Sequence, residues 1–160
     1  MWDNRPETVW FRENRMTIVA DAGSSGGAVS LIDSTAPGQT GPPLHSHPND
    51  ETFYVLDGEV AFAIDGEITR ASAGERAHVP GGHPHTFRIL SPTARMIVMC
   101  TPAGHERLFT TLGMPAGEGL PPRGTGPAVS DLVAAGAEFG MTVLGPPPAE
   151  LTELAPATAG

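Results

Sequence analysis

Residues 51–66 read ETFYVLDGEVAFAIDG, and this stretch decides the fold class. Two runs rich in aromatic and β-branched residues, 51–56 and 59–64, each end at an Asp-Gly pair, at 57–58 and 65–66. Asp-Gly beside such runs is among the strongest hairpin signals, because both turn positions favour a positive φ. We therefore expect two strands here, each closed by a tight turn, within an all-β protein.

Further strand candidates recur at short intervals on both sides of this stretch. They cover residues 16–20, 28–33, 67–71, 75–79, 86–90 and 95–101. Short, regularly spaced strands are typical of a β-sandwich or barrel. The 20 glycines and 17 prolines among 160 residues suit the turns of such a fold and argue against a helical bundle.

The last third of the sequence changes character. Residues 106–112 and 130–139 predict short C-terminal helices, and residues 141–144 predict one more strand. The expected organisation is a single domain over 1–145, with a barrel core at 16–101, helices and a strand over 105–145, and a flexible Pro/Ala-rich tail over 146–160.

Five of the six histidines fall in one quarter of the chain. In an extended chain, residues two apart point to the same side, so His45 and His47 face one side together. Glu51 has the same parity, and a second pair, His83 and His85, follows a Pro-Gly-Gly turn. Unpaired polar groups inside a barrel cost about 1–3 kcal/mol each. Three imidazoles and a carboxylate that converge there therefore indicate a divalent metal site.

These stretches resemble the two motifs of the cupin superfamily. The first motif is matched by His45, His47, Glu51 and Gly58, and the second by Gly74, Pro80, Gly82 and His85. The match departs at Ile89, where an Asn is common. That Asn is not a ligand, so the departure leaves the metal site intact. The resemblance spans about residues 38–100.

The resemblance implies a small jelly-roll barrel, which is a double-stranded β-helix, with short C-terminal helices. It implies that one divalent ion is held by His45, His47, Glu51 and His85. Fe, Ni, Mn, Co and Zn all suit this donor set, and the sequence does not choose among them. Metal cupins are commonly dimers, so a homodimer is expected.

The flanking stretches ERLF at 106–109 and EFGMTVLGPP at 138–147 resemble single-domain bacterial cupins similar to quercetin 2,3-dioxygenase. This resemblance implies a dioxygenase that acts with O₂ on a small enol, phenolic or flavonol-like substrate, with Glu51 as the catalytic base. Two alternatives stay open. One is a metal-assisted polyketide-type cyclase or isomerase that uses no O₂, and the other is a non-catalytic cupin that binds a small molecule.

Alternation along the strands places Phe53 on the face of Glu51, and Phe87 on the face of His85. The predicted substrate pocket consists of Phe53, Phe62, His83, Phe87 and Met99. Outside the pocket, His105 is expected to be solvated at a helix start, Arg88 and Arg95 to be surface charges, and Cys100 to be a buried thiol.

The charge balance disfavours a polyanionic partner. The chain has nine arginines, no lysine and 18 acidic residues, for a net charge of −9. Nucleic-acid binding requires basic side chains that neutralise phosphates, and anionic membrane surfaces make a similar demand. The sequence shows no signal-peptide pattern and no apolar run long enough to span a membrane. We therefore expect a cytoplasmic protein that binds neither nucleic acid nor membrane.

Overall fold

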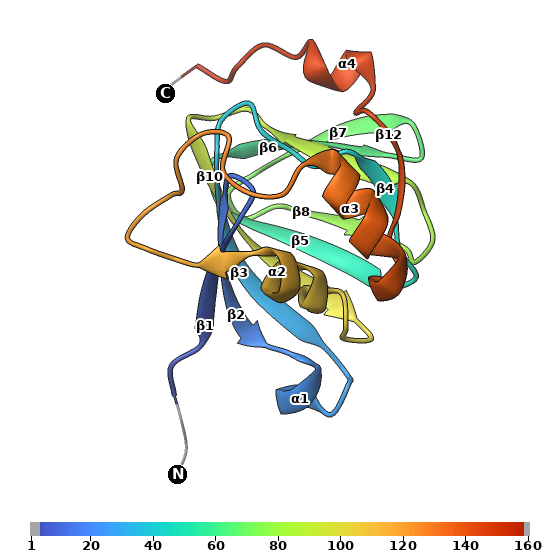
Figure 1. The fold of residues 1–160 in the computed structure, drawn as a ribbon. Coiled ribbons are helices and arrows are strands. Elements are labelled where there is room, and N and C mark those ends of the chain that lie inside the picture. The colour runs from blue at the N-terminus through green and yellow to red at the C-terminus, as the bar shows by residue number, and fades with distance from the viewer. Residues whose placement is uncertain (1–3, 159–160) are drawn as a thin grey trace.

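The computed structural model describes residues 4–158. Its strands form two antiparallel sheets that together make a double-stranded β-helix, or jelly roll (Figure 1). The seven-stranded sheet, in spatial order, contains β11 (Met114–Pro115), β1 (Glu7–Phe11), β2 (Asn14–Ala20), β3 (Ser30–Pro37), β10 (Thr93–Thr101), β5 (Asp50–Asp57) and β8 (Arg76–Val79). The five-stranded sheet contains β12 (Thr142–Gly145), β4 (Leu44–Ser46), β9 (His85–Ile89), β6 (Glu59–Ile64) and β7 (Glu67–Ser72).

The helices are short, as the sequence predicts for the C-terminal part. They are α1 (Ala22–Ser25), α2 (Glu106–Leu112), α3 (Val129–Gly136), the 3₁₀ turn η1 (Ala137–Phe139) and α4 (Ala149–Thr152). The all-β class with C-terminal helices is confirmed. The strand candidates of the barrel are confirmed as well, within a few residues at their ends. The sequence analysis missed α1, α4 and the strands β1, β4 and β11, most of which are very short.

The core lies between the two sheets, where inward side chains alternate with outward ones along each strand. Its fully buried members come from both sheets and include Ile32, Val55, Val60, Phe62, Ile89 and Met96. Cys100 is buried there too, as predicted, and burial raises the pKa of its thiol. The interior is therefore mostly apolar, which makes the buried polar groups described below conspicuous.

One of the two predicted hairpins is wrong. β5 pairs with β8 and β10, whereas β6 pairs with β7 and β9, so the Asp57-Gly58 turn leads from one sheet into the other. Gly58 has φ +89°, and a Cβ there would lie 2.5 Å from the Thr93 carbonyl oxygen. The second hairpin, β6–β7, is confirmed, with positive φ at both Asp65 and Gly66. Glu51 on β5 and His85 on β9 lie on opposite sheets.

The C-terminal segment packs on the barrel. Leu151 of α4 is fully buried against Ala61 and Leu90, and the Ala157 N–H donates to the Leu90 carbonyl at 2.8 Å. In Figure 1, α4 lies at the edge of the barrel and the chain then runs along it. The sequence did not predict this packing, and the flexibility of the tail over 146–160 stays a prediction.

Candidate metal centre

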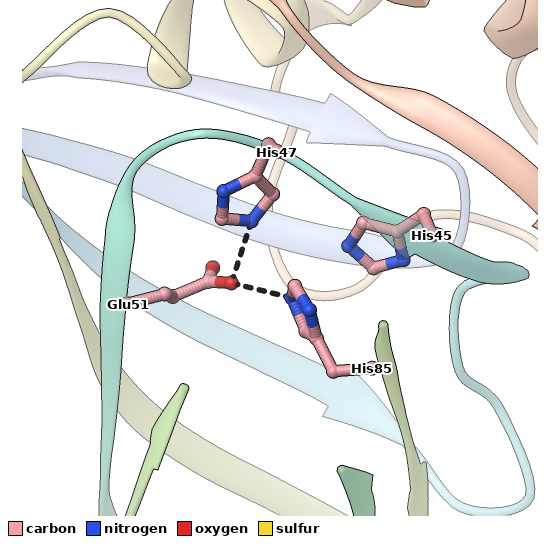
Figure 2. A group of neighbouring side chains, drawn as sticks. All are labelled: His45, His47, Glu51 and His85. Atoms are coloured by element: carbon pink, nitrogen blue, oxygen red, sulfur yellow. Dashed lines mark hydrogen bonds and ion pairs between the residues drawn. The ribbon is translucent and has the colours of Figure 1, made fainter. Parts of the chain in front are cut away.

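Four side chains meet inside the barrel. His45 lies on β4, His47 follows that strand directly, Glu51 lies on β5, and His85 begins β9. His45 and His85 are paired across the β4–β9 ladder. The ligand atoms of all four residues lie within 4.8 Å of one another, and every residue of the group is buried. The sequence-predicted set is thus brought together; we call it the histidine–glutamate cluster (Figure 2).

The Pro-Gly-Gly turn joins the two stretches that carry the cluster. The Gly82 N–H donates to the His47 carbonyl at 2.7 Å, and the Gly81 N–H donates to Asp50 Oδ1 at 2.7 Å. A Cβ on Gly81 would lie 2.1 Å from the Pro48 carbonyl oxygen, so only glycine permits this approach. The turn therefore fixes His85 beside His45 and His47.

Backbone carbonyls orient each histidine ring. The Nδ1 atoms of His45, His47 and His85 lie 2.8, 3.1 and 2.9 Å from the carbonyls of Pro43, Asn49 and His83. A carbonyl only accepts, so each Nδ1 carries the hydrogen and each neutral ring turns an Nε2 lone pair inward. Metal-binding histidines are held by the same kind of outer contact.

The atoms at the centre of the cluster require a positive charge among them. His47 Nε2 and His85 Nε2 each lie 2.9 Å from Glu51 Oε2, as the dashed lines in Figure 2 show. If the rings are neutral with hydrogen on Nδ1, lone pairs meet a carboxylate at these contacts, and a cation must sit among them. Extra protons or one metal ion could supply it. The buried His₃Glu donor set fits a divalent ion.

The pKa shifts of the cluster also favour a positive charge at this place. Burial, and then the neighbouring His85, lower the pKa of His45 to about 4, so this ring is neutral at pH 7. Burial alone would raise the pKa of Glu51, but its contacts with His47 and His85 hold it well below its usual value. Burial likewise opposes protonation of His85, yet the contact with Glu51 raises its pKa overall. The ionised Glu51 thus attracts a positive charge to this spot.

The prediction that His105 is solvated is wrong. Its side chain is 3% exposed, and its ring centroid lies 4.2 Å from that of His47 and 5.2 Å from that of Phe109. The reason is that α2 presents its buried face, with Leu108, to the barrel. His105 Nδ1 has no hydrogen-bond partner among residues 4–158, and burial lowers the pKa of the ring to about 3. The spacing of His105, Leu108 and Phe109 on one helix face could have indicated this.

The cluster opens onto a cavity of about 530 Å³. His45, Glu51 and His105 contribute polar groups to its wall. Apolar side chains cover much of the remainder, among them Phe11, Met16, Phe53, Phe87, Leu108 and Phe109. A largely apolar cavity of this size with a few convergent polar groups is the usual form of a small-molecule site.

The predicted pocket residues divide into three groups. Phe53 and Phe87 line the cavity. Phe62 packs behind them, with its ring centroid 5.1 Å from that of Phe53, and does not reach the cavity wall. His83 and Met99 do not lie on the wall of this cavity either. His83 is half exposed and contacts Asp65 Oδ2 at 2.6 Å, while Met99 points outward from β10 between the inward Val98 and Cys100.

Comparison with known proteins relates the cluster to a protein family. The model of the cupin domain matches residues 32–102, a span that includes all four residues of the cluster. Residues 32–102 thus match the cupin domain. The two sheets and the structural neighbours below agree with the double-stranded β-helix of this family.

Three relatives illustrate the similarity. The chain is 26% identical to quercetin 2,3-dioxygenase of Bacillus subtilis (strain 168) over 110 residues, which is 68% of this chain and 33% of that protein. It resembles an RmlC-like cupin from Shewanella frigidimarina NCIMB 400 (TM-score 0.55, 17% identity, 64% of this chain and 89% of that one). It also resembles the polyketide cyclase RemF from Streptomyces resistomycificus (TM-score 0.50, 22% identity, 62% and 70%). The two structural likenesses show the fold alone.

Proposed function

We propose that this cupin is a metal-dependent enzyme in which the histidine–glutamate cluster holds one divalent ion, as Fe, Ni, Mn, Co or Zn. The observation that carries the proposal is the convergence of three histidine rings on one buried carboxylate inside a mostly apolar barrel. Similarity to quercetin 2,3-dioxygenase, which covers about one third of that relative's length, favours a dioxygenase. The substrate class would be a small enol, phenol or flavonol.

The chain's own residues then have distinct roles. A bound ion would supply Lewis acidity, which lowers the pKa of a coordinated hydroxyl group, and a place for O₂ next to it. His45, His47 and His85 hold their rings in the ligand tautomer through backbone carbonyls. Glu51 is the catalytic base that takes the hydroxyl proton, since its carboxylate is ionised and faces the cavity. Phe53 and Phe87 hold the apolar part of the substrate and exclude water.

O₂ uptake by the metal-loaded protein tests this proposal. A panel of flavonols, catechols and enediols is offered with and without air, and substrate loss is followed in parallel. We expect substrate loss and O₂ consumption in equal amounts, and no reaction under strict anaerobiosis. Turnover that persists unchanged without O₂ would overturn the dioxygenase and favour the metal-assisted cyclase or isomerase. Binding of the panel without any turnover would favour a non-catalytic cupin.

Two further expectations belong to the proposal. Within residues 4–158, no helix is both long and apolar enough to cross a membrane. We propose a cytoplasmic protein, which cell fractionation can check. We also propose a homodimer, supported by the exposed apolar side chains of Tyr54, Leu56 and Met99 on the adjacent strands β5 and β10. Light scattering that gives the mass of a single chain would contradict it.

A further inference from the structure

The cavity holds a second set of polar side chains that the metal centre does not use. Arg12 and Arg88 both line the cavity that reaches His45 and Glu51. Arg12 Nη1 and Arg88 Nε are buried and have no hydrogen-bond partner among residues 4–158. A buried donor without an acceptor costs about 1–3 kcal/mol, and more when the group is charged. Each of these two cavity-lining residues thus has one guanidinium donor without a partner; we call Arg12 and Arg88 the arginine pair.

Arg88 differs from the surface charge that the sequence predicts. Its side chain is half buried, and its Nη2 donates to Gln39 Oε1. Arg95, by contrast, is the exposed arginine that the sequence predicts, and both its Nε and its Nη2 donate to Asp33. Alternation puts Arg88 on the face of β9 opposite His85, so its side chain does not belong to the histidine–glutamate cluster.

The carboxylate of Glu13, the acidic residue next to Arg12, accepts hydrogen bonds from other groups. Glu13 follows it in the chain, but Glu13 Oε2 accepts from Arg123 Nη1 at 3.1 Å and Glu13 Oε1 accepts from the Gly124 N–H at 3.1 Å. Burial lowers the pKa of Arg12 from its usual value, yet a guanidinium keeps its charge at any physiological pH. Glu13 therefore attracts the charge of Arg12, but the hydrogen bonds of its carboxylate go to Arg123 and Gly124.

The backbone at Arg12 is also unfavourable. Arg12 has φ +53° in the two-residue turn between β1 and β2, where Phe11 pairs with Asn14. Glycine is the favoured residue at such a position, and a side chain there costs about 1–2 kcal/mol. The loop at Gly126 packs on this turn, because a Cβ on Gly126 would lie 2.6 Å from the Arg12 nitrogen. Strain of this kind is typical of functional sites.

We propose that the arginine pair binds a carboxylate of the substrate, so that the cavity takes an amphipathic organic acid. Planar guanidinium groups match a carboxylate with parallel hydrogen bonds. The apolar body of the acid would lie against Phe53, Phe87 and Phe109, and its other polar end would reach the histidine–glutamate cluster. The inference rests on the proposed function only in taking this cavity as the substrate site.

Calorimetric titration with phenylacetate and phenylacetamide tests the inference, because the two probes share a shape and differ in charge. The purified, metal-loaded protein is compared with Arg12→Gly, Arg88→Gln and the control Arg76→Gln, which changes an exposed arginine of β8. We expect the wild type and the control to bind the acid about tenfold more tightly than the amide. Arg12→Gly should abolish this preference and Arg88→Gln should reduce it, while affinity for the amide stays the same. Glycine suits the turn, so folding should be kept.

A metal ion could bind the carboxylate instead, and His85→Ala separates the two sites. Acid preference that survives in His85→Ala but disappears in Arg12→Gly supports the arginine pair. Preference that disappears in His85→Ala but survives in Arg12→Gly overturns it, as does a wild type that shows no preference. Metal content is measured in the same samples. A wild type that lacks metal yet shows the Arg12-dependent preference would remove the proposed metal enzyme and leave this inference standing.

Discussion

The histidine–glutamate cluster and the arginine pair line the same cavity, and they differ in how their polar atoms are satisfied. In the cluster, every Nδ1 has a backbone carbonyl, and the remaining lone pairs face an ionised carboxylate. In the arginine pair, charged donors are buried without an acceptor. The first arrangement suits a cation and the second an anion. The cavity is therefore electrically polarised although its walls are largely apolar.

Replacement of Glu51 by Gln should give the largest effect, because it removes the negative charge of the cluster and the base together. We expect turnover of a flavonol or enediol substrate by the metal-loaded protein to fall about a hundredfold or more. The measurement is the initial rate of O₂ uptake. Glu59→Gln is the matched control, since Glu59 only pairs with the exposed Arg70. A wild-type rate in Glu51→Gln would show that the cluster does not act as proposed.

Acid should weaken metal binding next most strongly. His85 has a raised pKa, so below that value a proton competes with the ion for the ring. A lowering from pH 7 to pH 5 should therefore weaken the affinity by more than about tenfold for this one ligand. Equilibrium dialysis against the metal ion at fixed ionic strength measures the change. Equal affinity at the two pH values would contradict an imidazole-rich site.

His105 is a third kind of polar group on the cavity wall, because its buried Nδ1 has no hydrogen-bond partner among residues 4–158. Its pKa of about 3 lies below that of an unfolded histidine, so the unfolded state binds more protons between these values. The free energy of unfolding should then fall as the pH falls, by about 2 kcal/mol at pH 5 from this group. His105→Leu should remove that part of the acid sensitivity.

Urea unfolding of metal-free protein at pH 7 and pH 5 checks this expectation. His78→Leu is the control, because His78 is exposed on β8 and its Nδ1 only contacts Thr52 Oγ1 at 2.8 Å. If wild type, His105→Leu and His78→Leu all lose the same free energy of unfolding between the two pH values, the low pKa of His105 is refuted.

Arg12→Gly should have the smallest effect, and it should raise the free energy of unfolding. It relieves the positive φ and removes an unpaired buried donor, which outweighs the extra freedom of glycine in the unfolded chain. We expect a gain of about 1 kcal/mol, or about 2–4 °C in Tm. Arg12→Ala, which keeps the strained backbone, should gain less. A lower Tm for Arg12→Gly in calorimetry would mean that Arg12 stabilises the turn and is not held there for a ligand.

The barrel strands and the histidine–glutamate cluster could be predicted because their signals are local. Alternation fixes which side chains of a strand share a face, and the two motifs fix the spacing of His45, His47, Glu51 and His85. The sheet partners of β6 could not be predicted, since Asp57-Gly58 and Asp65-Gly66 look alike and only one closes a hairpin. That choice depends on the close approach of Gly58 to the Thr93 carbonyl, far along the chain.

Other residues of the cavity wall could not be predicted, because their burial also depends on segments that are distant in the sequence. His105 is buried because α2 packs on the barrel, and Arg12 is half buried where the loop at Gly126 covers its turn. The contact at Arg12 leaves no periodic signal near that residue, whereas the helical spacing of His105, Leu108 and Phe109 did offer one. The outward position of Met99, by contrast, was open to prediction, because Met99 is one residue away from the buried Cys100 on the same strand.

Metal content tests the central claim most directly. Purified, untagged protein is analysed by mass spectrometry of the elements, beside His45→Ala, His85→Ala and the exposed-histidine control His78→Ala. We expect about one divalent ion per chain in the wild type and the control, and almost none in the two cluster variants. Full metal content in His45→Ala and His85→Ala would contradict it.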